Sequence, residues 1–255
     1  MLAEMAAMSP SASALHLLAR CENDLGKLTP ALDHLADAEA EIDDGDDGAG
    51  ATRAEVAGSR SVVLENAGDA AGADAAFARA RALDVAALRA HCKRRSDALR
   101  AAGDSGGAAH ALARLAAGGV PSDLADLAAV ELARGDYERA EVLYRRAREG
   151  DPGLARAFAG GAEILKRRVF GNIKTNRPPT INHDDLDGKI VAIDECVELM
   201  RAEIDLVEGS GAGDAARQRR VLAFLDGELA SWRERSRTAG PGFSCGIVFC
   251  ACHED

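Results

Sequence analysis

The chain has 255 residues, of which 47% are apolar, so it can bury the core of one large domain or two small ones and is not a disordered protein. A net charge of −11 and an aromatic content of 4% disfavour binding to phosphate backbones, anionic membranes and stacked bases, so we expect no nucleic acid and no membrane as partner. The chain has no apolar run of the ~20 residues that span a bilayer, no recognisable signal peptide and 6 unevenly spaced cysteines, which predicts a cytoplasmic protein with reduced thiols.

Four stretches of the chain share one spacing of small and large apolar residues. In the clearest stretch, the residues that follow Gly135 at offsets of 2, 5, 9 and 12 are Tyr137, Ala140, Tyr144 and Ala147. The same offsets recur after three other glycines, Gly26, Gly68 and, more weakly, Gly103. The spacing is that of one helix face, and glycine suits the positive φ at which the preceding helix ends. Each stretch therefore predicts a pair of antiparallel helices, and such pairs must stack to bury their apolar faces.

These residues resemble the tetratricopeptide repeat (TPR), most closely in the segment ARGDYERAEVLYRRAREGDP of the unit at 121–154. The resemblance predicts a TPR-like domain over 12–168, with units at about 12–45, 54–87, 89–120 and 121–154 and a further helix at 155–168. It implies an all-α fold, a right-handed α-solenoid whose concave groove binds a peptide or a partner protein.

The composition changes after residue 168. Residues 169–183 contain glycine, asparagine and two prolines, which predicts a loop. Apolar residues then recur at alternating spacings of 4 and 3, at Leu186, Ile190, Ile193, Val197, Met200, Ile204 and Val207. After GSGAG, a second apolar face comprises Val221, Leu225, Leu229 and Trp232. The sequence predicts an αα-hairpin over 184–237 that either caps the exposed end of the solenoid or forms a homodimer through 186–207.

The segment 238–255 is an apolar tail that contains potential metal ligands. Three thiols and an imidazole, which could bind zinc tetrahedrally, are those of Cys245, Cys250, Cys252 and His253. The single residue between Cys250 and Cys252 is a tighter spacing than zinc sites use, so we expect a tail that docks on the hairpin or completes a groove.

His183 and Asp185, together with His253, are ligand types of non-haem iron oxygenases. That chemistry normally sits on a double-stranded β-barrel, whereas the residues between Asp185 and His253 predict two helices. We therefore expect no metal site, no cofactor and no catalytic residue in this chain.

The concave groove is the remaining candidate site. In the TPR family, the first helix of each pair lines this groove, and the resemblance carries that position to Arg20, Asn23, Lys93, Arg94, Asp97, Arg100, Arg156 and Lys166. Cations gathered inside an acidic chain would reverse the sign of the charge locally and favour an acidic partner segment. The alternative is that they are solvated helix residues balanced by nearby acids. The asparagines with which the family clamps chaperone carboxyl termini are missing, which disfavours that partner.

The sequence thus predicts a protein-interaction module or scaffold, not an enzyme, that binds a protein or peptide in the groove of a TPR-like solenoid. An alternative from another class is an accessory or truncated, non-catalytic part of a TPR-containing enzyme such as a non-haem iron oxygenase.

Overall fold

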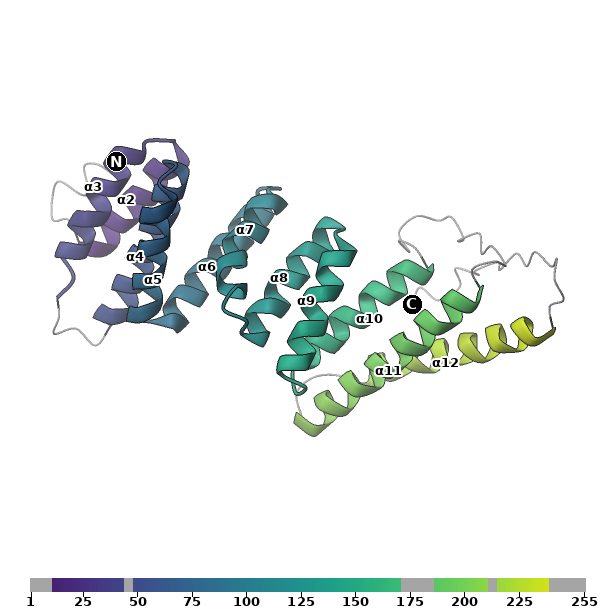
Figure 1. Ribbon diagram of the computed structural model, residues 1–255. Helices are drawn as coiled ribbons and strands as arrows, with labels where there is room; N and C mark the ends of the chain where they lie inside the picture. Colours follow the sequence, from purple (N-terminus) through teal and green to yellow (C-terminus); the bar gives the residue numbers. More distant parts are fainter. Residues whose placement is uncertain (1–10, 44–47, 171–185, 211–214, 239–255) are drawn as a thin grey trace. The chain divides into compact units, whose positions relative to one another are not determined.

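The computed structural model describes residues 11–43, 48–170, 186–210 and 215–238 (Figure 1). Every regular element in these ranges is an α-helix, and successive helices pair as hairpins, which confirms the all-α, TPR-like prediction. The helices form two compact units, residues 1–111 and 112–255, which we call the N-terminal and C-terminal units.

The N-terminal unit contains two complete helix pairs and the start of a third. Its helices are α2 (Ala12–Asp24), α3 (Leu28–Ala40), α4 (Ala49–Asn66), α5 (Ala70–Leu83), α6 (Val85–Ala101) and the first part of α7 (Ser105–Ala116). α2 pairs with α3 and α4 with α5, while α4 also contacts α2 and α6. α4 and α6 begin a few residues before the predicted units because Gly48 and Asp84 are their N-caps. The Asp84 carboxylate accepts hydrogen bonds from the backbone N–H groups of Ala86 and Ala87, which fixes the start of α6.

One turn recurs in both units, and it joins the two helices of each pair. Its glycine has a positive φ of 72°, 81°, 84° and 86° at Gly26, Gly68, Gly103 and Gly135 respectively. In each turn, the N–H of the residue after the glycine donates to a carbonyl five positions earlier, as from Asp136 to Glu131 at 3.0 Å. In three of the turns that residue is an aspartate whose carboxylate caps the second helix, at Asp69, Asp104 and Asp136. The repeated Gly–Asp pair thus ends one helix and starts the next.

Small residues lie on the buried faces of the paired helices. The four alanines five positions after the turn glycines are fully buried, and they are Ala31, Ala73, Ala108 and Ala140. A bare Cα at Gly160 plays the same part in the C-terminal unit, because a methyl group there would overlap the Tyr144 ring. The spacing of small and large residues in the sequence therefore sets the distances between helices.

The C-terminal unit contains the rest of α7 and five further helices, α8 (Pro121–Arg134), α9 (Tyr137–Gly150), α10 (Ala155–Phe170), α11 (Leu186–Ser210) and α12 (Ala215–Thr238). α8 pairs with α9, α10 lies against both, and α11 lies between α10 and α12. The predicted hairpin is thus present, and α10 runs two residues into the segment predicted as a loop.

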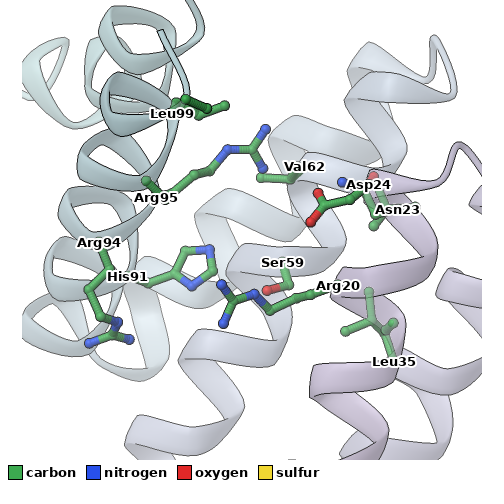
Figure 2. A pocket seen from close by; sticks show the side chains of 14 residues that line it. Arg20, Asn23, Asp24, Leu35, Ser59, Val62, His91, Arg94, Arg95 and Leu99 are labelled. Atoms are coloured by element: carbon green, nitrogen blue, oxygen red, sulfur yellow. The ribbon is translucent and has the colours of Figure 1, made fainter. Parts of the chain in front are cut away.

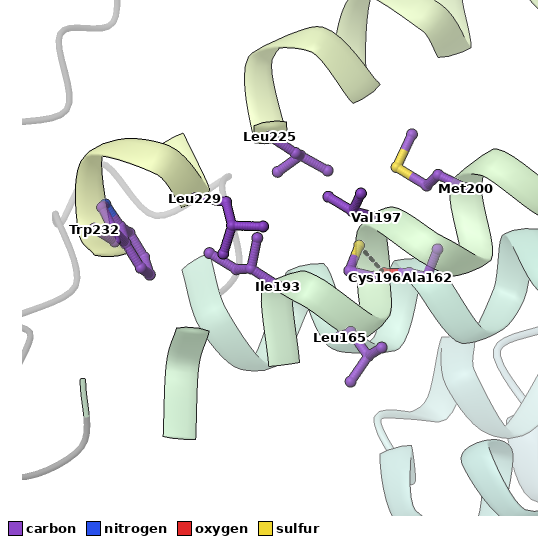
Figure 3. Close-up of a cluster of buried hydrophobic side chains, with 9 residues drawn as sticks. All are labelled: Ala162, Leu165, Ile193, Cys196, Val197, Met200, Leu225, Leu229 and Trp232. Atoms are coloured by element: carbon purple, nitrogen blue, oxygen red, sulfur yellow. Dashed lines mark hydrogen bonds between the residues drawn. The ribbon is translucent and has the colours of Figure 1, made fainter. Parts of the chain in front are cut away.

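The apolar seam of α11 is buried inside this unit (Figure 3). Ile193, Val197 and Met200 pack with Ala162 and Leu165 of α10 and with residues of α12, which are Leu225, Leu229 and Trp232. The Cys196 thiol lies in the same cluster and donates to the carbonyl oxygen of Ala162 at 3.4 Å. Since burial raises the pKa of Cys196 to about 11, this thiol is not a reactive thiolate at neutral pH.

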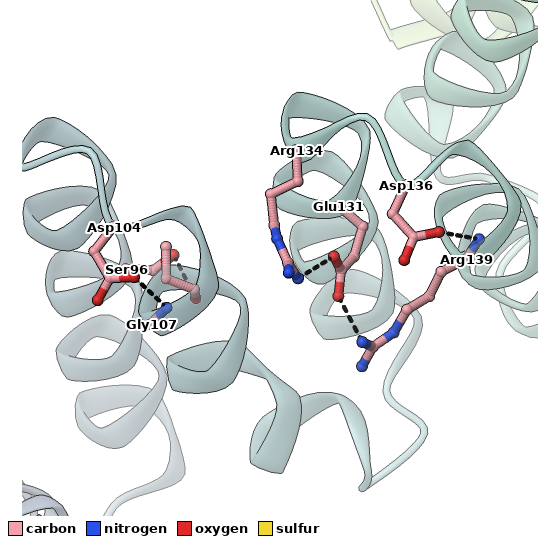
Figure 4. A network of polar contacts seen from close by, with 8 residues as sticks. Ser96, Asp104, Gly107, Glu131, Arg134, Asp136 and Arg139 are labelled. Carbon is pink, nitrogen blue, oxygen red and sulfur yellow. Dashed lines mark hydrogen bonds and ion pairs between the residues drawn. The ribbon is translucent and has the colours of Figure 1, made fainter.

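A fully buried carboxylate links α8 to α9 (Figure 4). Glu131 lies 2.7 Å from Nη1 of Arg134 and 3.0 Å from Nη1 of Arg139, whereas both arginines remain partly exposed. A buried charge without partners is strongly unfavourable, so this pairing makes Glu131 compatible with the core.

Enlarging the alanine at a helix crossing tests the packing. We expect Ala140→Leu to lower the free energy of unfolding by about 1–3 kcal/mol, because the crossing leaves no room for a larger side chain. The exposed Ala129 provides the control, and Ala129→Leu should change stability by less than about 0.5 kcal/mol. Urea denaturation measures both, and equal midpoints for the two variants would refute the close crossing.

Removing both partners of Glu131 tests the buried carboxylate. The double variant Arg134→Ala/Arg139→Ala should lose about 3 kcal/mol or more, because it leaves a buried charge without compensation. A matched pair on the exposed face of α9, Arg145→Ala/Arg146→Ala, removes the same charge and should cost less than about 1 kcal/mol. Chemical denaturation measures the free energy of unfolding of both double variants. Similar losses in the two would contradict the buried pairing.

Candidate functional site

The N-terminal unit contains a pocket of about 320 Å³ between α2, α4 and α6, the first helices of its helix pairs (Figure 2). The polar side chains that line it are Arg20, Asn23 and Asp24 of α2, Ser59 of α4, and His91, Arg94 and Arg95 of α6. Larger apolar side chains complete the lining, namely Leu35, Val62, Val63 and Leu99.

Helical spacing brings these side chains to the pocket. On α6, the lining positions 91, 94, 95, 98, 99 and 102 recur every three or four residues, and they form one stripe along the helix. The adjoining stripe of α6 is buried through Leu88, Cys92 and Ser96, and His91 of the lining is itself buried. Ser96 belongs to that buried stripe because its hydroxyl donates to the Ala108 carbonyl at 3.0 Å.

Two contacts between helices hold the rim of the pocket. The Arg94 guanidinium on α6 pairs with the Glu55 carboxylate on α4 at 2.7 Å. The Asn66 amide on α4 donates a hydrogen bond of 2.8 Å to Oδ1 of Asn23 on α2. The polar rim therefore ties all three helices together.

The other two guanidiniums are arranged differently. Among the residues that the structure describes, neither Arg20 nor Arg95 has a carboxylate within 4.0 Å. Arg95 is half-buried, and burial lowers its pKa, an effect opposed by the more distant carboxylates of Glu65 and Asp24. The pocket thus has an excess of positive charge that its own acids do not neutralise at close range.

Two histidines lie beside these arginines. His16 shares a 2.7 Å hydrogen bond between its Nε2 and the Ser59 hydroxyl, and burial lowers its pKa, with a smaller effect from Arg20. His91 is 9% exposed, and burial, assisted by His16 and the arginines, lowers its pKa to about 4. Both rings are therefore neutral at pH 7.

The structure brings three of the eight predicted site residues to this pocket, Arg20, Asn23 and Arg94. On α6, Lys93 is half-buried outside the pocket lining, while Asp97 and Arg100 form an exposed ion pair of 2.8 Å with each other. The last two residues, Arg156 and Lys166, lie on α10 of the C-terminal unit, where Arg156 pairs with Asp126 at 2.8 Å and Lys166 with Glu163 at 2.9 Å.

Sequence reasoning did not include His91, Arg95, Asp24 and Ser59 in the site. One signal was present: Arg95 occupies a repeat position where an apolar residue is usual. His91 precedes Arg95 by one helical turn and lies on the same face of the helix. The unusual arginine therefore also points to the face that carries His91.

The other predicted sites give little further chemistry. Within the described ranges, no group of three or more His, Cys, Asp or Glu residues is placed to hold a metal ion. The potential ligands of the tail and loop, His183, Asp185, Cys245, Cys250, Cys252 and His253, lie outside those ranges. None of the described helices combines the length and apolar character required to cross a membrane.

No protein-family model matches the sequence, and no curated protein matches it. Among solved structures, the chain is similar to the C-terminal part of a TPR repeat-containing protein from Cytophaga hutchinsonii, with 12% identity, a TM-score of 0.43, and coverage of 92% of this chain and 81% of that chain. It is also similar to residues 1–338 of the Assembly Chaperone of RpL4 (Acl4), with 14% identity, a TM-score of 0.31, and coverage of 90% of this chain and 100% of that chain.

The pocket makes the stability of the protein dependent on pH. His91 binds a proton near pH 6.5 in the unfolded chain but only near pH 4 in the folded protein. Between these values the unfolded state holds more protons, so the contribution of His91 to the free energy of unfolding falls by about 3 kcal/mol as pH drops from 6.5 to 4.

We expect His91→Gln to remove that part of the pH dependence. Chemical denaturation at pH 8 gives the packing cost of the substitution, because both proteins are then neutral at this position. Relative to that reference, the free energy of unfolding of the variant should fall less than that of the wild type as the pH drops towards 4. A constant difference between the two proteins from pH 8 to pH 4 would show that His91 is not buried as a neutral ring.

Proposed function

We propose that this protein is a protein-interaction module that binds an acidic segment of a partner protein on the pocket face of its N-terminal unit. One observation carries the proposal: Arg20, Arg94 and Arg95 converge from two helices on a single pocket of a chain whose net charge is −11. Asp24 is the one carboxylate among the described residues of the lining.

Stability alone does not account for this arrangement. Arg94 has its own carboxylate partner, but Arg95 is half-buried, and no carboxylate of the described ranges lies within 4.0 Å of it. Desolvating a guanidinium is unfavourable unless an anion compensates it. A carboxylate from a partner would provide that compensation.

Apolar side chains around the cations favour a segment that contains both acidic and apolar residues. Leu17 precedes Arg20 by one turn of α2 and is 48% exposed, and Val62 and Leu99 line the pocket itself. Charged contacts would steer the partner to this face and select it, while the apolar contacts would contribute buried area.

The expected homodimer through 186–207 forms no part of the proposal. Ile193, Val197, Met200 and Ile204 are buried within the chain, so the central part of the seam has no free apolar surface to offer a second copy. The hairpin instead covers α10, as a cap would. The enzyme-related alternative also gains no support. The region between the potential iron ligands of such an enzyme contains the helices α11 and α12, as the sequence predicts.

Charge reversal on the pocket face tests this function. We expect Arg20→Glu/Arg94→Glu to abolish capture of the main partner in a quantitative pull-down with the full chain. The two substitutions make the charge of the pocket face more negative by four units, so this face should repel an acidic segment. The helical spectrum should persist, and the lost exposed ion pair with Glu55 should cost no more than about 1 kcal/mol.

The control Lys27→Glu/Arg81→Glu changes the net charge equally, at two exposed positions of the same unit outside the pocket. It should capture the same partner as the wild type. Unchanged capture by the Arg20→Glu/Arg94→Glu variant would place binding elsewhere on the chain and overturn the proposal.

A further inference from the structure

One face of α12 is covered by no other described helix. The helix packs on α11 through the buried cluster of Figure 3, and the face opposite that cluster is exposed. Arg220, Gly227 and Glu234 lie on this exposed face, and because they are seven residues apart, about two helical turns, they form a line along the helix. Phe224, which is 47% exposed, lies beside the line. We call these four residues the α12 face.

Other charged residues of α12 pair with α11 along one edge of the helix. These ion pairs join Arg219 to Glu208, Asp226 to Arg201 and Arg233 to Asp194. Arg220 takes no part in them, and no carboxylate of the described ranges lies within 4.0 Å of it. Glu234 contacts Arg237 of its own helix at 3.8 Å, and its side chain remains 67% exposed. The α12 face therefore presents one cation and one anion to a partner.

Gly227 has no packing role among the described residues. No atom lies within 4 Å of the position that its Cβ would take. Two other glycines inside helices differ, because a Cβ at Gly58 would crowd His91 and a Cβ at Gly160 would overlap Tyr144. Glycine weakens a helix interior relative to alanine, and it is useful where another backbone comes close. A close contact from outside the chain would account for glycine at this position.

The α12 face is complementary to itself. In an antiparallel pair of α12 helices with its two-fold axis at Gly227, the residue seven positions before the axis lies level with the residue seven positions after it in the second copy. Arg220 then faces Glu234 of the second copy, and the symmetry repeats this pair at the other end. A parallel pair would place like charges opposite each other, which is unfavourable.

The centre of such a pair is apolar and contains small residues. Ala223, which is exposed, would lie opposite Ala230 of the second copy, and Phe224 would cover Gly227 and Ser231 of that copy. The small side chains allow the two helices to approach closely, so that the Phe224 ring is buried on both sides of the axis.

We propose that two copies of this chain associate through an antiparallel pair of α12 helices that cross at Gly227, with Phe224 at the centre and ion pairs between Arg220 and Glu234 at both ends. This inference is independent of the proposed function. One helix from each copy buries less than the ~1,200 Å² of a stable specific interface, so the dimer is weak and dissociates on dilution.

Sedimentation equilibrium of the full chain from about 1 to 500 μM tests the proposal, with a reductant present so that no disulfide links two copies. We expect a reversible monomer–dimer equilibrium with a Kd on the order of 100 μM. A monomer at every concentration would overturn the proposal, because another segment or another protein would then be the occupant of the α12 face.

Charge exchange tests the pairing itself. Arg220→Glu should weaken the dimer at least about tenfold, because it opposes two glutamates at both ends of the helix pair. The double variant Arg220→Glu/Glu234→Arg restores opposite charges and should return the Kd to within about threefold of the wild type. Arg81→Glu, the same change at an exposed position of α5, should leave the Kd unchanged. Failure of the double variant to recover would overturn the antiparallel pairing.

A substitution at the axis separates dimerisation from folding. Gly227→Lys places two lysines against each other at the crossing and should abolish the dimer. The melting temperature of the dilute protein should not fall, because the position is open within the described chain and lysine favours a helix. Gly209→Lys makes the same change on α11, where the space around Cβ is also open, and should dimerise as the wild type does. Wild-type dimerisation of the Gly227→Lys protein would place the contact elsewhere and overturn the proposal.

Discussion

The close approach of two helices at a buried alanine is the constraint on which this structure depends. Ala31, Ala73 and Ala140 have no exposed surface, and each lies five residues after a glycine that ends the preceding helix. The turn fixes where the second helix starts, and the alanine fixes how near it comes. Repetition of this unit in the N-terminal unit brings α2, α4 and α6 side by side, and the pocket lies between them.

Much of this arrangement could be predicted from the sequence because it depends on local spacing. The glycines at 26, 68, 103 and 135 all adopt the positive φ that their positions required. The face that α6 presents to the pocket was harder to predict. Its buried stripe includes Ser96, whose hydroxyl bonds to the Ala108 carbonyl, so apolarity alone does not identify that stripe. The stripe with His91 and Arg95 therefore escaped the prediction, while Asp97 and Arg100, predicted to face the groove, pair with each other outside the pocket.

Two treatments of buried charge distinguish the α8–α9 pair from the pocket of the N-terminal unit. The fully buried carboxylate of Glu131 has two arginine partners, so the α8–α9 pair neutralises its charge internally. In the pocket of the N-terminal unit, none of the described residues gives Arg95 a close counter-charge or Nε2 of His91 a hydrogen bond. Both groups make the free protein less stable than apolar side chains of similar shape would. An anionic group of a partner in the pocket, as the proposed function requires, would offset the part of that cost that comes from Arg95.

The stability of the Arg95→Met protein without any ligand tests this central claim most directly. Methionine retains much of the apolar stem of Arg95 and removes the half-buried charge. The account therefore predicts a free energy of unfolding at least equal to that of the wild type. Relief from burying the charge should raise it by about 1 kcal/mol. The measurement is urea denaturation of both full chains at pH 8, where His91 is neutral in the folded and the unfolded state. A loss of more than about 1 kcal/mol in the variant would show that Arg95 stabilises the fold, and it would contradict the view that this guanidinium is held for a partner.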